Sequence, residues 1–190
     1  MESFPSRPFI VAHDSAGACT GPAARFALMR FGAFVPQGWR SELAGKPVHE
    51  HWDWMSDFAR LIESSGYESL WVFDHFHTIP EPVQEVTYEA WSLMASLAAV
   101  TSTVRLGQMC TCNSYRPPGM LAKIAATIDV VSSGRVEMGI GAGWYEHEYH
   151  GYGYEFPKPA VRIGMLRESV EIMKALWTED EVTYDDKYYK

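Results

Sequence analysis

Alternating apolar runs and amphipathic stretches along the chain predict four strands, each followed by a helix. Short apolar runs typical of strands lie at residues 31–36, 69–74, 104–111 and 136–140. After each of them, apolar residues recur at the three-and-four spacing of amphipathic helices, at about 48–65, 88–100, 118–133 and 162–177. The second run, SLWVFD, is apolar almost throughout, as expected for a strand that is covered on both faces.

The strand starts, near residues 31, 69, 104 and 135, repeat every three to four dozen positions. Successive strand-helix units predict an α/β fold with parallel strands and right-handed crossovers. Four such units form either an open sheet or half of a closed TIM-barrel type fold, which typically needs about 250 residues. Because the chain has 190 residues, about four βα units, a half barrel, are expected. In both folds ligands bind at the carboxyl ends of the strands.

The segments outside this repeat carry predictions of their own. Residues 1–28 are broken by Pro, Gly and Ser and are expected to form a loose N-terminal tail, with the folded domain at 29–190 and the gene itself starting at Met29. Thr87 is placed to cap the second helix. Residues 145–159 are expected to form a polar loop, and residues 182–189 a small hairpin.

Charge and cysteine content exclude several classes of protein. The net charge is −8 and no basic cluster occurs, which argues against a nucleic-acid-binding surface. No apolar run reaches the roughly 18 residues of a membrane-spanning helix. Cys110 and Cys112 lie two apart on one face of a predicted strand, a poor geometry for a disulfide. Together with Cys19 they are interpreted as reduced thiols of a cytoplasmic protein.

The residues Asp74-His75-Phe76-His77 follow the second predicted strand. A carboxylate beside an imidazole at the carboxyl end of a strand can orient a ligand and move a proton, because histidine titrates near neutrality. The alternative is a loop histidine beside an aspartate that caps nearby amides. His75 and His77 could also be paired metal ligands, as in barrel hydrolases, although no further ligand set is evident.

Three more motifs follow the third and fourth strands. The run Gly139-Ile140-Gly141-Ala142-Gly143 departs from the dinucleotide fingerprint, and its glycines either let the backbone approach a ligand or form a tight turn. The sequence HEYH at 147–150 is one residue short of a zinc-protease motif. It leaves Glu146, His147 and Tyr149 as candidates for polar contacts at the rim, or as a solvated loop. Arg116 could bind an anionic group or pair with a surface carboxylate.

Several of these motifs occur together, in this order, in one known family. They are the stretches 31–38, 74–76, 113–117, 121–123, 129–135, 139–145 and 175–178. From about Met29 to Tyr189 the chain closely resembles the N-terminal half of the luciferase-like monooxygenase family. The resemblance is greatest to the branch that uses the deazaflavin coenzyme F-420 (hereafter F420).

The resemblance implies an eight-stranded βα barrel that binds FMN or F420 at the carboxyl ends of its strands. It implies that His75 is catalytic and lies with Asp74 near the cofactor ring. It also implies a bulge around Met109 to Cys112 behind the ring, often with a non-proline cis peptide. The cofactor-binding residues expected on this basis are Asp74, His75, Met109, Cys110, Thr111, Asn113, Gly141, Gly143, Trp144 and Tyr145, with no metal ligand.

Two departures from the family pattern limit what carries over. Some sugar-phosphate dehydrogenases of the family have a glutamate where this chain has Trp144, so their substrate does not carry over. The later strands, which in the family hold the cofactor phosphate, are missing, so a homo-oligomer or a complementing C-terminal half is expected. The leading hypothesis is an oxidoreductase or monooxygenase acting on a small organic substrate. The alternatives are an inactive half-barrel paralogue that acts through assembly, and a metal-dependent barrel hydrolase.

Overall fold

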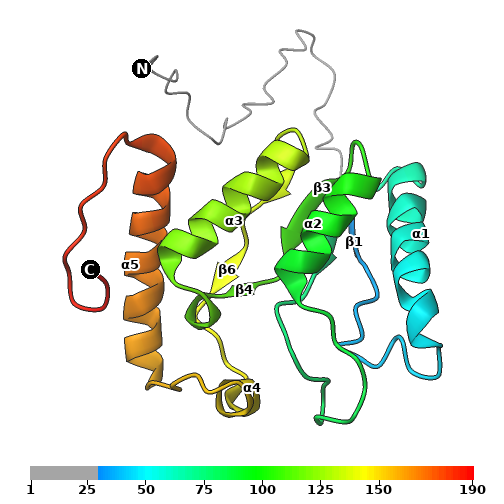
Figure 1. Ribbon diagram of the computed structural model, residues 1–190, viewed down its shortest axis with the longest axis horizontal. Coiled ribbons are helices and arrows are strands. Elements are labelled where there is room, and N and C mark those ends of the chain that lie inside the picture. The colour runs from blue at the N-terminus through cyan, green and yellow to red at the C-terminus, as the bar shows by residue number, and fades with distance from the viewer. Residues whose placement is uncertain (1–29) are drawn as a thin grey trace, which may run out of the picture.

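Four short parallel strands form the central sheet, in the order β1-β2-β3-β5 (Figure 1). They are β1 (Gly32–Phe34), β2 (Ser69–Val72), β3 (Arg105–Gln108) and β5 (Val136–Glu137). The structure is a computed structural model and describes residues 30–190. The predicted tail, Cys19 and the proposed start at Met29 lie outside these residues. The parallel α/β architecture predicted from the sequence is confirmed.

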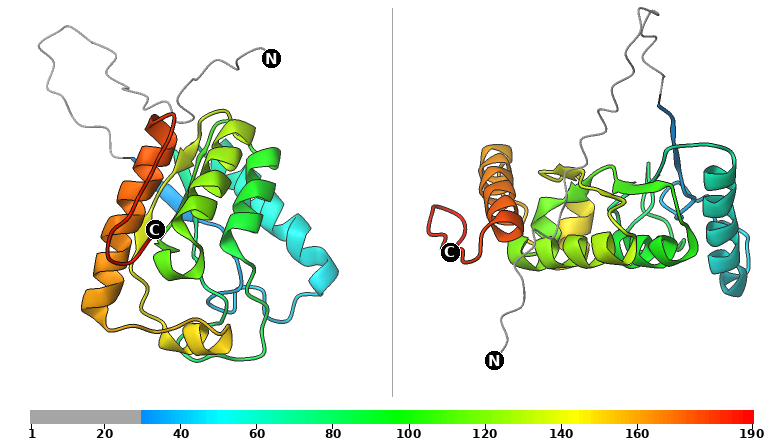
Figure 2. Two further views of the ribbon diagram at one scale, coloured as in Figure 1. Left: turned by 60° about the vertical axis from the view of Figure 1, so that its left-hand side comes forward. Right: turned by 90° about the horizontal axis from the view of Figure 1, so that it is seen from above.

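Four long helices follow the strands and form one layer against the sheet (Figure 2). They are α1 (His51–Ser64), α2 (Ala90–Val100), α3 (Pro118–Val131) and α5 (Pro159–Thr178), with a 3-10 turn at Val48–Glu50 before α1. Neighbouring helices of the layer contact each other in the order α1, α2, α3, α5. The core lies between this layer and the sheet, where Leu70, Val72 and Leu106 from the strands are fully buried against helical residues.

The predicted ends of α3 are confirmed, whereas α2 and α5 begin at other residues than predicted, α5 at Pro159 instead of about 162. Pro118 occupies the first turn of α3, where a missing N–H group costs nothing, and Gly134 follows the helix with a φ of 85°. The predicted cap Thr87 is wrong, because α2 begins at Ala90 and its cap is Glu89. The Glu89 carboxylate accepts hydrogen bonds from the N–H groups of the first helical turn, a role that shorter side chains usually fill.

The third and fourth predicted strands are each divided into two parts. After β3 the chain passes a cis peptide between Met109 and Cys110 and resumes as β4 (Thr111–Cys112), which pairs in parallel with β6 (Ile140–Gly141). The predicted bulge with a non-proline cis peptide is therefore confirmed. The prediction that Cys110 and Cys112 share a face is wrong. Cys110 lies in the break between β3 and β4 and is exposed, whereas Cys112 is buried, and both thiols are free.

Two segments after β6 also differ from the prediction. The expected loop at 145–159 contains a short helix, α4 (Glu146–Gly151). The expected hairpin at 182–189 contains no strand. Instead, the backbone N–H groups of Tyr188 and Tyr189 donate to the buried carboxylate of Glu168 on α5, at 2.9 and 3.1 Å. The end of the chain therefore folds back along α5, as Figure 1 shows.

The face of the sheet opposite the helices has no helix of the described residues against it (Figure 2). Trp71 lies across this face, and a Cβ atom at Gly107 of β3 would come within 2.3 Å of its indole ring, so only glycine fits there. Phe34 stacks on Phe73 with ring centroids 4.3 Å apart, yet remains 41% exposed. The outer strands β1 and β5 each have a free edge among residues 30–190. An apolar face and two sheet edges are thus open.

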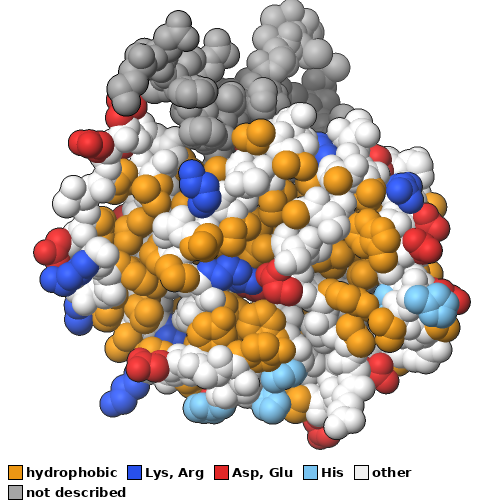
Figure 3. All heavy atoms as spheres, viewed as in Figure 1, with side chains coloured by type: hydrophobic (Ala, Val, Ile, Leu, Met, Phe, Trp, Pro, Cys, Tyr) orange, Lys and Arg blue, Asp and Glu red, His pale blue; other side chains and the backbone are white. Residues whose placement is uncertain are grey.

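Over residues 30–190, no helix combines the length and the apolar character that crossing a bilayer requires. Hydrophobic, acidic and basic side chains are interspersed on the face in Figure 3. Histidine side chains gather at its lower edge, where α4 lies in the same view of Figure 1.

Candidate active site

The carboxyl ends of the second, third and fourth strands meet at one cavity of about 360 Å3. Asp74 and His75 follow β2, Met109–Cys112 end the third strand, and the glycine run follows β6. Of the predicted site residues, the ones that line this cavity are Asp74, His75, Met109, Cys110, Thr111, Gly141, Gly143, Trp144 and Tyr145. Trp39, Cys112, Tyr115 and Ala142 complete its lining. Segments more than 60 residues apart in the sequence thus converge where the strand pattern predicts.

Asn113 is the predicted site residue that lies apart from the cavity. It begins a 3-10 turn (Asn113–Tyr115) and is 1% exposed. Its Nδ2 group donates to the hydroxyl of Tyr189, at 3.2 Å. In this structure Asn113 therefore contacts the returning end of the chain rather than the space beside His75.

His75 is held by aromatic rings on several sides. Its imidazole stacks on Trp39 with parallel rings and centroids 4.5 Å apart. The rings of Trp144 and Tyr145 meet it edge-on, at 5.6 and 5.9 Å. Its Nδ1 atom lies 2.8 Å from Oε2 of Glu148 on α4. One ring nitrogen is thereby engaged, and Nε2 forms no hydrogen bond within residues 30–190.

Glu148 is a candidate site residue that the sequence analysis missed. Its side chain is completely buried, and Oε1 accepts the backbone N–H groups of Phe76 and His77, at 2.6 and 2.9 Å. Oε2 accepts from Tyr115 Oη at 2.7 Å as well as facing His75. Burial alone would raise the pKa of Glu148, but the hydrogen bonds from His75, His77 and Tyr115 keep this pKa below its ordinary value. Glu148 is therefore a buried carboxylate that accepts four hydrogen bonds.

Asp74 is occupied by an internal ion pair. Arg116 binds it with two nitrogens, at 2.7 and 2.9 Å, and the N–H group of Cys112 donates to the same carboxylate at 2.8 Å. Arg116 also contacts Glu89, the cap of α2. Burial raises the pKa of Asp74, and the guanidinium opposes this change. Of the two interpretations of Arg116, pairing with a carboxylate is the one observed, although that carboxylate is buried rather than on the surface.

The thiol of Cys112 points at a tyrosine instead of a charged group. Its Sγ atom lies 3.2 Å from the hydroxyl of Tyr149, and burial raises the pKa of the thiol, so the neutral form is favoured. Tyr149, predicted at the rim, is 0% exposed and lies in the core of this region. The other two rim candidates, Glu146 and His147, are exposed, as predicted for a solvated surface.

The pairing of His75 and His77 as metal ligands is not supported by their partners. The ring of His77 packs against His147 and Tyr152, with centroids 4.8 and 5.4 Å away, while Nδ1 of His75 faces Glu148. In the described part of the chain, no three side chains of His, Cys, Asp or Glu are grouped as metal ligands. The geometry therefore favours proton chemistry at His75 over metal coordination by this pair.

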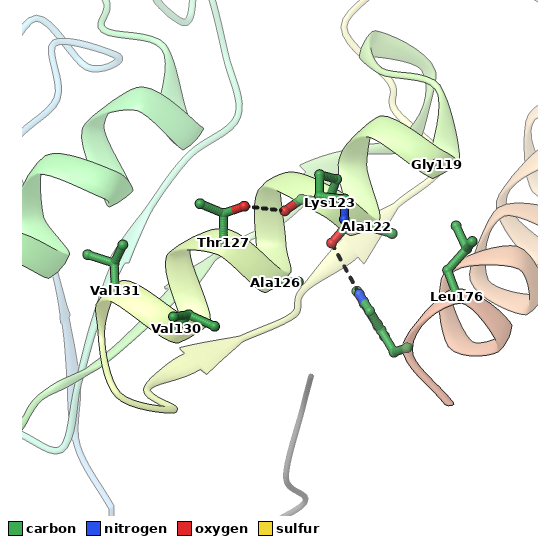
Figure 4. Close-up of a pocket in the computed structure, with 9 residues that line it drawn as sticks. Gly119, Ala122, Lys123, Ala126, Thr127, Val130, Val131 and Leu176 are labelled. Atoms are coloured by element: carbon green, nitrogen blue, oxygen red, sulfur yellow. Dashed lines mark hydrogen bonds between the residues drawn. The ribbon is translucent and has the colours of Figure 1, made fainter. Parts of the chain in front are cut away.

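A second cavity, also of about 360 Å3, lies between α3 and α5 on the outside of the fold (Figure 4). Ala122, Ala126, Val130 and Leu176 give it apolar walls, and its one charged lining residue is Lys123. The indole of Trp177 donates to the carbonyl of Ala122 at 3.1 Å. Lys123 is the one titratable residue of this groove, whereas the other cavity brings a histidine and an aspartate together at the strand ends, so the cavity at His75 is the candidate active site.

Comparison with known proteins identifies relatives in which this region is part of a longer chain. An uncharacterised protein of Mycobacterium tuberculosis is 35% identical over 147 residues, which cover 70% of this chain and 51% of that protein. The F420-dependent glucose-6-phosphate dehydrogenase of Kineococcus radiotolerans is 36% identical over 139 residues, covering 71% and 40% of the two chains. The chain thus spans about half the length of the curated relatives that it matches.

Solved structures give the same result for the fold. An F420-dependent secondary alcohol dehydrogenase in complex with an F420-acetone adduct superposes with a TM-score of 0.69 and 27% identity, over 85% of this chain and 46% of that chain. The oxygenating constituent of 3,6-diketocamphane monooxygenase from Pseudomonas putida, solved with FMN, superposes equally well at 22% identity and supports the fold alone. The sequence model of the luciferase-like monooxygenase family matches residues 29–190. The chain therefore belongs to the luciferase-like monooxygenase family.

Proposed function

We propose that this chain forms the ring-binding part of an oxidoreductase that uses F420 or FMN on a small organic substrate. The observation that carries the proposal is the position of His75 at the cavity where the strand ends converge. Its imidazole stacks on Trp39, and its Nδ1 atom is hydrogen-bonded to Glu148. A histidine held in one orientation beside a ligand cavity is suited to moving a proton to or from a substrate.

The cavity suits a flat heteroaromatic ring. Its walls are planar side chains, the backbone at the Met109–Cys110 peptide, and small residues such as Gly141 and Ala142. When bound there, a deazaflavin would exchange a hydride with the substrate, whereas a reduced flavin would activate oxygen. We favour F420, because relatives at 36% and 27% identity are named as F420-dependent.

The cavity supplies no evident partner for a cofactor phosphate. No lysine or arginine from residues 30–190 lines it, and its one carboxylate, Asp74, is paired with Arg116. We therefore propose that the phosphate-binding groups come from outside these residues, either from a complementing C-terminal half or from a second copy in a homo-oligomer. Such a partner would also cover the free edges of β1 and β5.

A second candidate function, favoured by the same lack of a basic group, is a non-catalytic paralogue that acts through assembly. For either function the free thiols Cys110 and Cys112 are consistent with a reducing, cytoplasmic setting.

Titration of the full chain with F420 and with FMN, followed by ring absorbance and fluorescence, tests the proposal. We expect F420 to bind with a dissociation constant in the micromolar range. Gly141→Leu should abolish binding, because its side chain would fill the cavity beside His75. Gly119→Leu is the matched control, because it fills the other groove and meets no atom within 4 Å at its Cβ position. If the folded protein binds neither cofactor, the ring-binding proposal is wrong and the non-catalytic alternative is favoured.

A further inference from the structure

We infer that Glu148 is a positioning residue that fixes the tautomer of His75, so that the imidazole presents an unprotonated Nε2 to the ligand cavity. This inference rests on the proposed function for its catalytic consequence, but the tautomer itself is a property of the chain alone. The two residues lie 73 positions apart, on α4 and on the loop after β2.

The hydrogen bonds of the Glu148 carboxylate show that Oε1 acts only as an acceptor. This atom faces two backbone N–H groups, those of Phe76 and His77, which can only donate. It therefore acts as an acceptor for the loop that carries His75, and it sets the distance between that loop and α4.

The other oxygen, Oε2, sets the proton on the imidazole. It faces Nδ1 of His75 at 2.8 Å and the hydroxyl of Tyr115 at 2.7 Å. An ionised carboxylate has no proton to donate, and the lowered pKa of Glu148 keeps it ionised near neutral pH. Nδ1 must then carry the hydrogen, which leaves the lone pair of a neutral imidazole on Nε2.

The aromatic contacts of His75 hinder a ring flip, which would put Cδ2 in the place of Nδ1. The parallel stack on Trp39 restricts tilting of the imidazole, and Trp144 and Tyr145 meet it edge-on. Turning the ring over would place a C–H group against Oε2 and remove a hydrogen-bond donor from the fully buried carboxylate of Glu148, which is unfavourable. The histidine is thus fixed in both orientation and tautomer before a ligand arrives.

The variant Glu148→Gln separates the two oxygens. Its amide oxygen can take the place of Oε1 and accept from Phe76 and His77, so the loop keeps its anchor. Its amide nitrogen then faces His75 and can only donate, which requires an unprotonated Nδ1. His75 is therefore expected to change to the Nε2–H tautomer while the fold is kept.

The test is long-range 1H–15N NMR of histidine-labelled protein without cofactor, at about pH 8.5, well above the ordinary histidine pKa of about 6.5. We expect Nδ1–H at His75 in the wild type and Nε2–H in Glu148→Gln. The control Tyr115→Phe removes the other donor to Oε2 and should leave Nδ1–H unchanged. An Nε2–H signal in the wild type overturns the inference, and this measurement remains decisive even if the glutamine variant fails to fold.

Turnover of a bound F420 tests the catalytic consequence separately. With the full chain in its assembled state, and with F420 and a secondary alcohol as the probe substrate, Glu148→Gln should lower kcat about 100-fold or more, the usual contribution of a positioned acid-base group, with less than a threefold change in cofactor affinity. A tautomer change without any cofactor binding supports the positioning role and refutes the proposed function instead. An unchanged kcat despite the tautomer change overturns the catalytic part of the inference.

Discussion

Replacing Arg116 with alanine isolates the energetic role of the ion pair beneath the candidate site. Arg116 is 12% exposed at its side chain, and its partner Asp74 is 0% exposed. The substitution removes both hydrogen bonds from the guanidinium and leaves Asp74 with the N–H group of Cys112 as its remaining donor. A buried carboxylate would then lack its counter-charge.

Breaking one side of a buried pair typically costs about 3–5 kcal/mol. Because a domain of this size has a total free energy of unfolding of about 5–15 kcal/mol, Arg116→Ala should lose about a fifth or more of it. The loss should depend on pH. Removing the guanidinium raises the already elevated pKa of Asp74 in the folded state, whereas the unfolded chain ionises at about pH 3.9.

The sign of the pH dependence follows from proton binding. Above about pH 4 the unfolded variant releases a proton that the folded variant keeps, so stability falls by up to about 1.4 kcal/mol per pH unit. The stability of the variant stops falling once the pH passes the pKa of Asp74 in the folded state. The destabilisation by Arg116→Ala is therefore smallest at acidic pH and largest near neutrality.

Urea denaturation between about pH 4 and pH 8 measures these differences. Asp74→Asn removes the buried charge, so adding Arg116→Ala to it should cost much less than in the wild type. Arg167→Ala, at an arginine that is 68% exposed, is the matched control and should change stability by less than about 0.5 kcal/mol. A loss that is independent of pH, or equal in both Asp74 backgrounds, would refute the reasoning.

Two further substitutions test contacts away from the cavity. Glu63 accepts hydrogen bonds from the N–H groups of Ser102, Thr103 and Val104. Partial burial raises the pKa of Glu63, but these hydrogen bonds outweigh it and lower the pKa to about 2. After allowance for solvent screening, Glu63→Gln should cost about 1–2 kcal/mol at pH 7, and the difference from wild type should vanish as pH falls from about 4.5 through about 2. A difference that persists in acid would contradict this account. The Arg135 guanidinium donates to five oxygens around the end of α2, and one ammonium group cannot replace it. Arg135→Lys should therefore lower the free energy of unfolding by about 2–3 kcal/mol in urea denaturation, and an unchanged midpoint would disprove that role.

The strands and their parallel direction could be predicted because their signals are local. SLWVFD is apolar almost throughout, and Gly134 ends α3 with the positive φ that glycine adopts readily. Since parallel strands point the same way, the residues after each strand had to share one rim, which placed His75 and Gly141 together correctly. The break at Cys110 was among the features that the family resemblance implied.

The missed features depend on contacts between distant residues. Glu148 stands in a six-residue helix without an apolar period, and its partners His75 and Tyr115 lie 73 and 33 positions away. A HEYH motif without a third metal ligand was a weak hint that its glutamate points inward. Arg116 similarly gave no sign that it would be buried against Asp74. Such pairs become visible only once the fold brings their elements together.

Asp74 and His75 are neighbours in sequence, yet they are secured from opposite sides, the first by Arg116 and the second by Glu148. Trp144 at the same cavity is 60% exposed and has no comparable anchor. Substitutions at the two anchored residues, Asp74 and His75, should therefore be poorly tolerated, whereas substitutions at the exposed Trp144 should be tolerated well. Substitutions at Trp144 should therefore cost little folding stability, and their effect should instead be on the proposed ligand site and on the ring contact with His75.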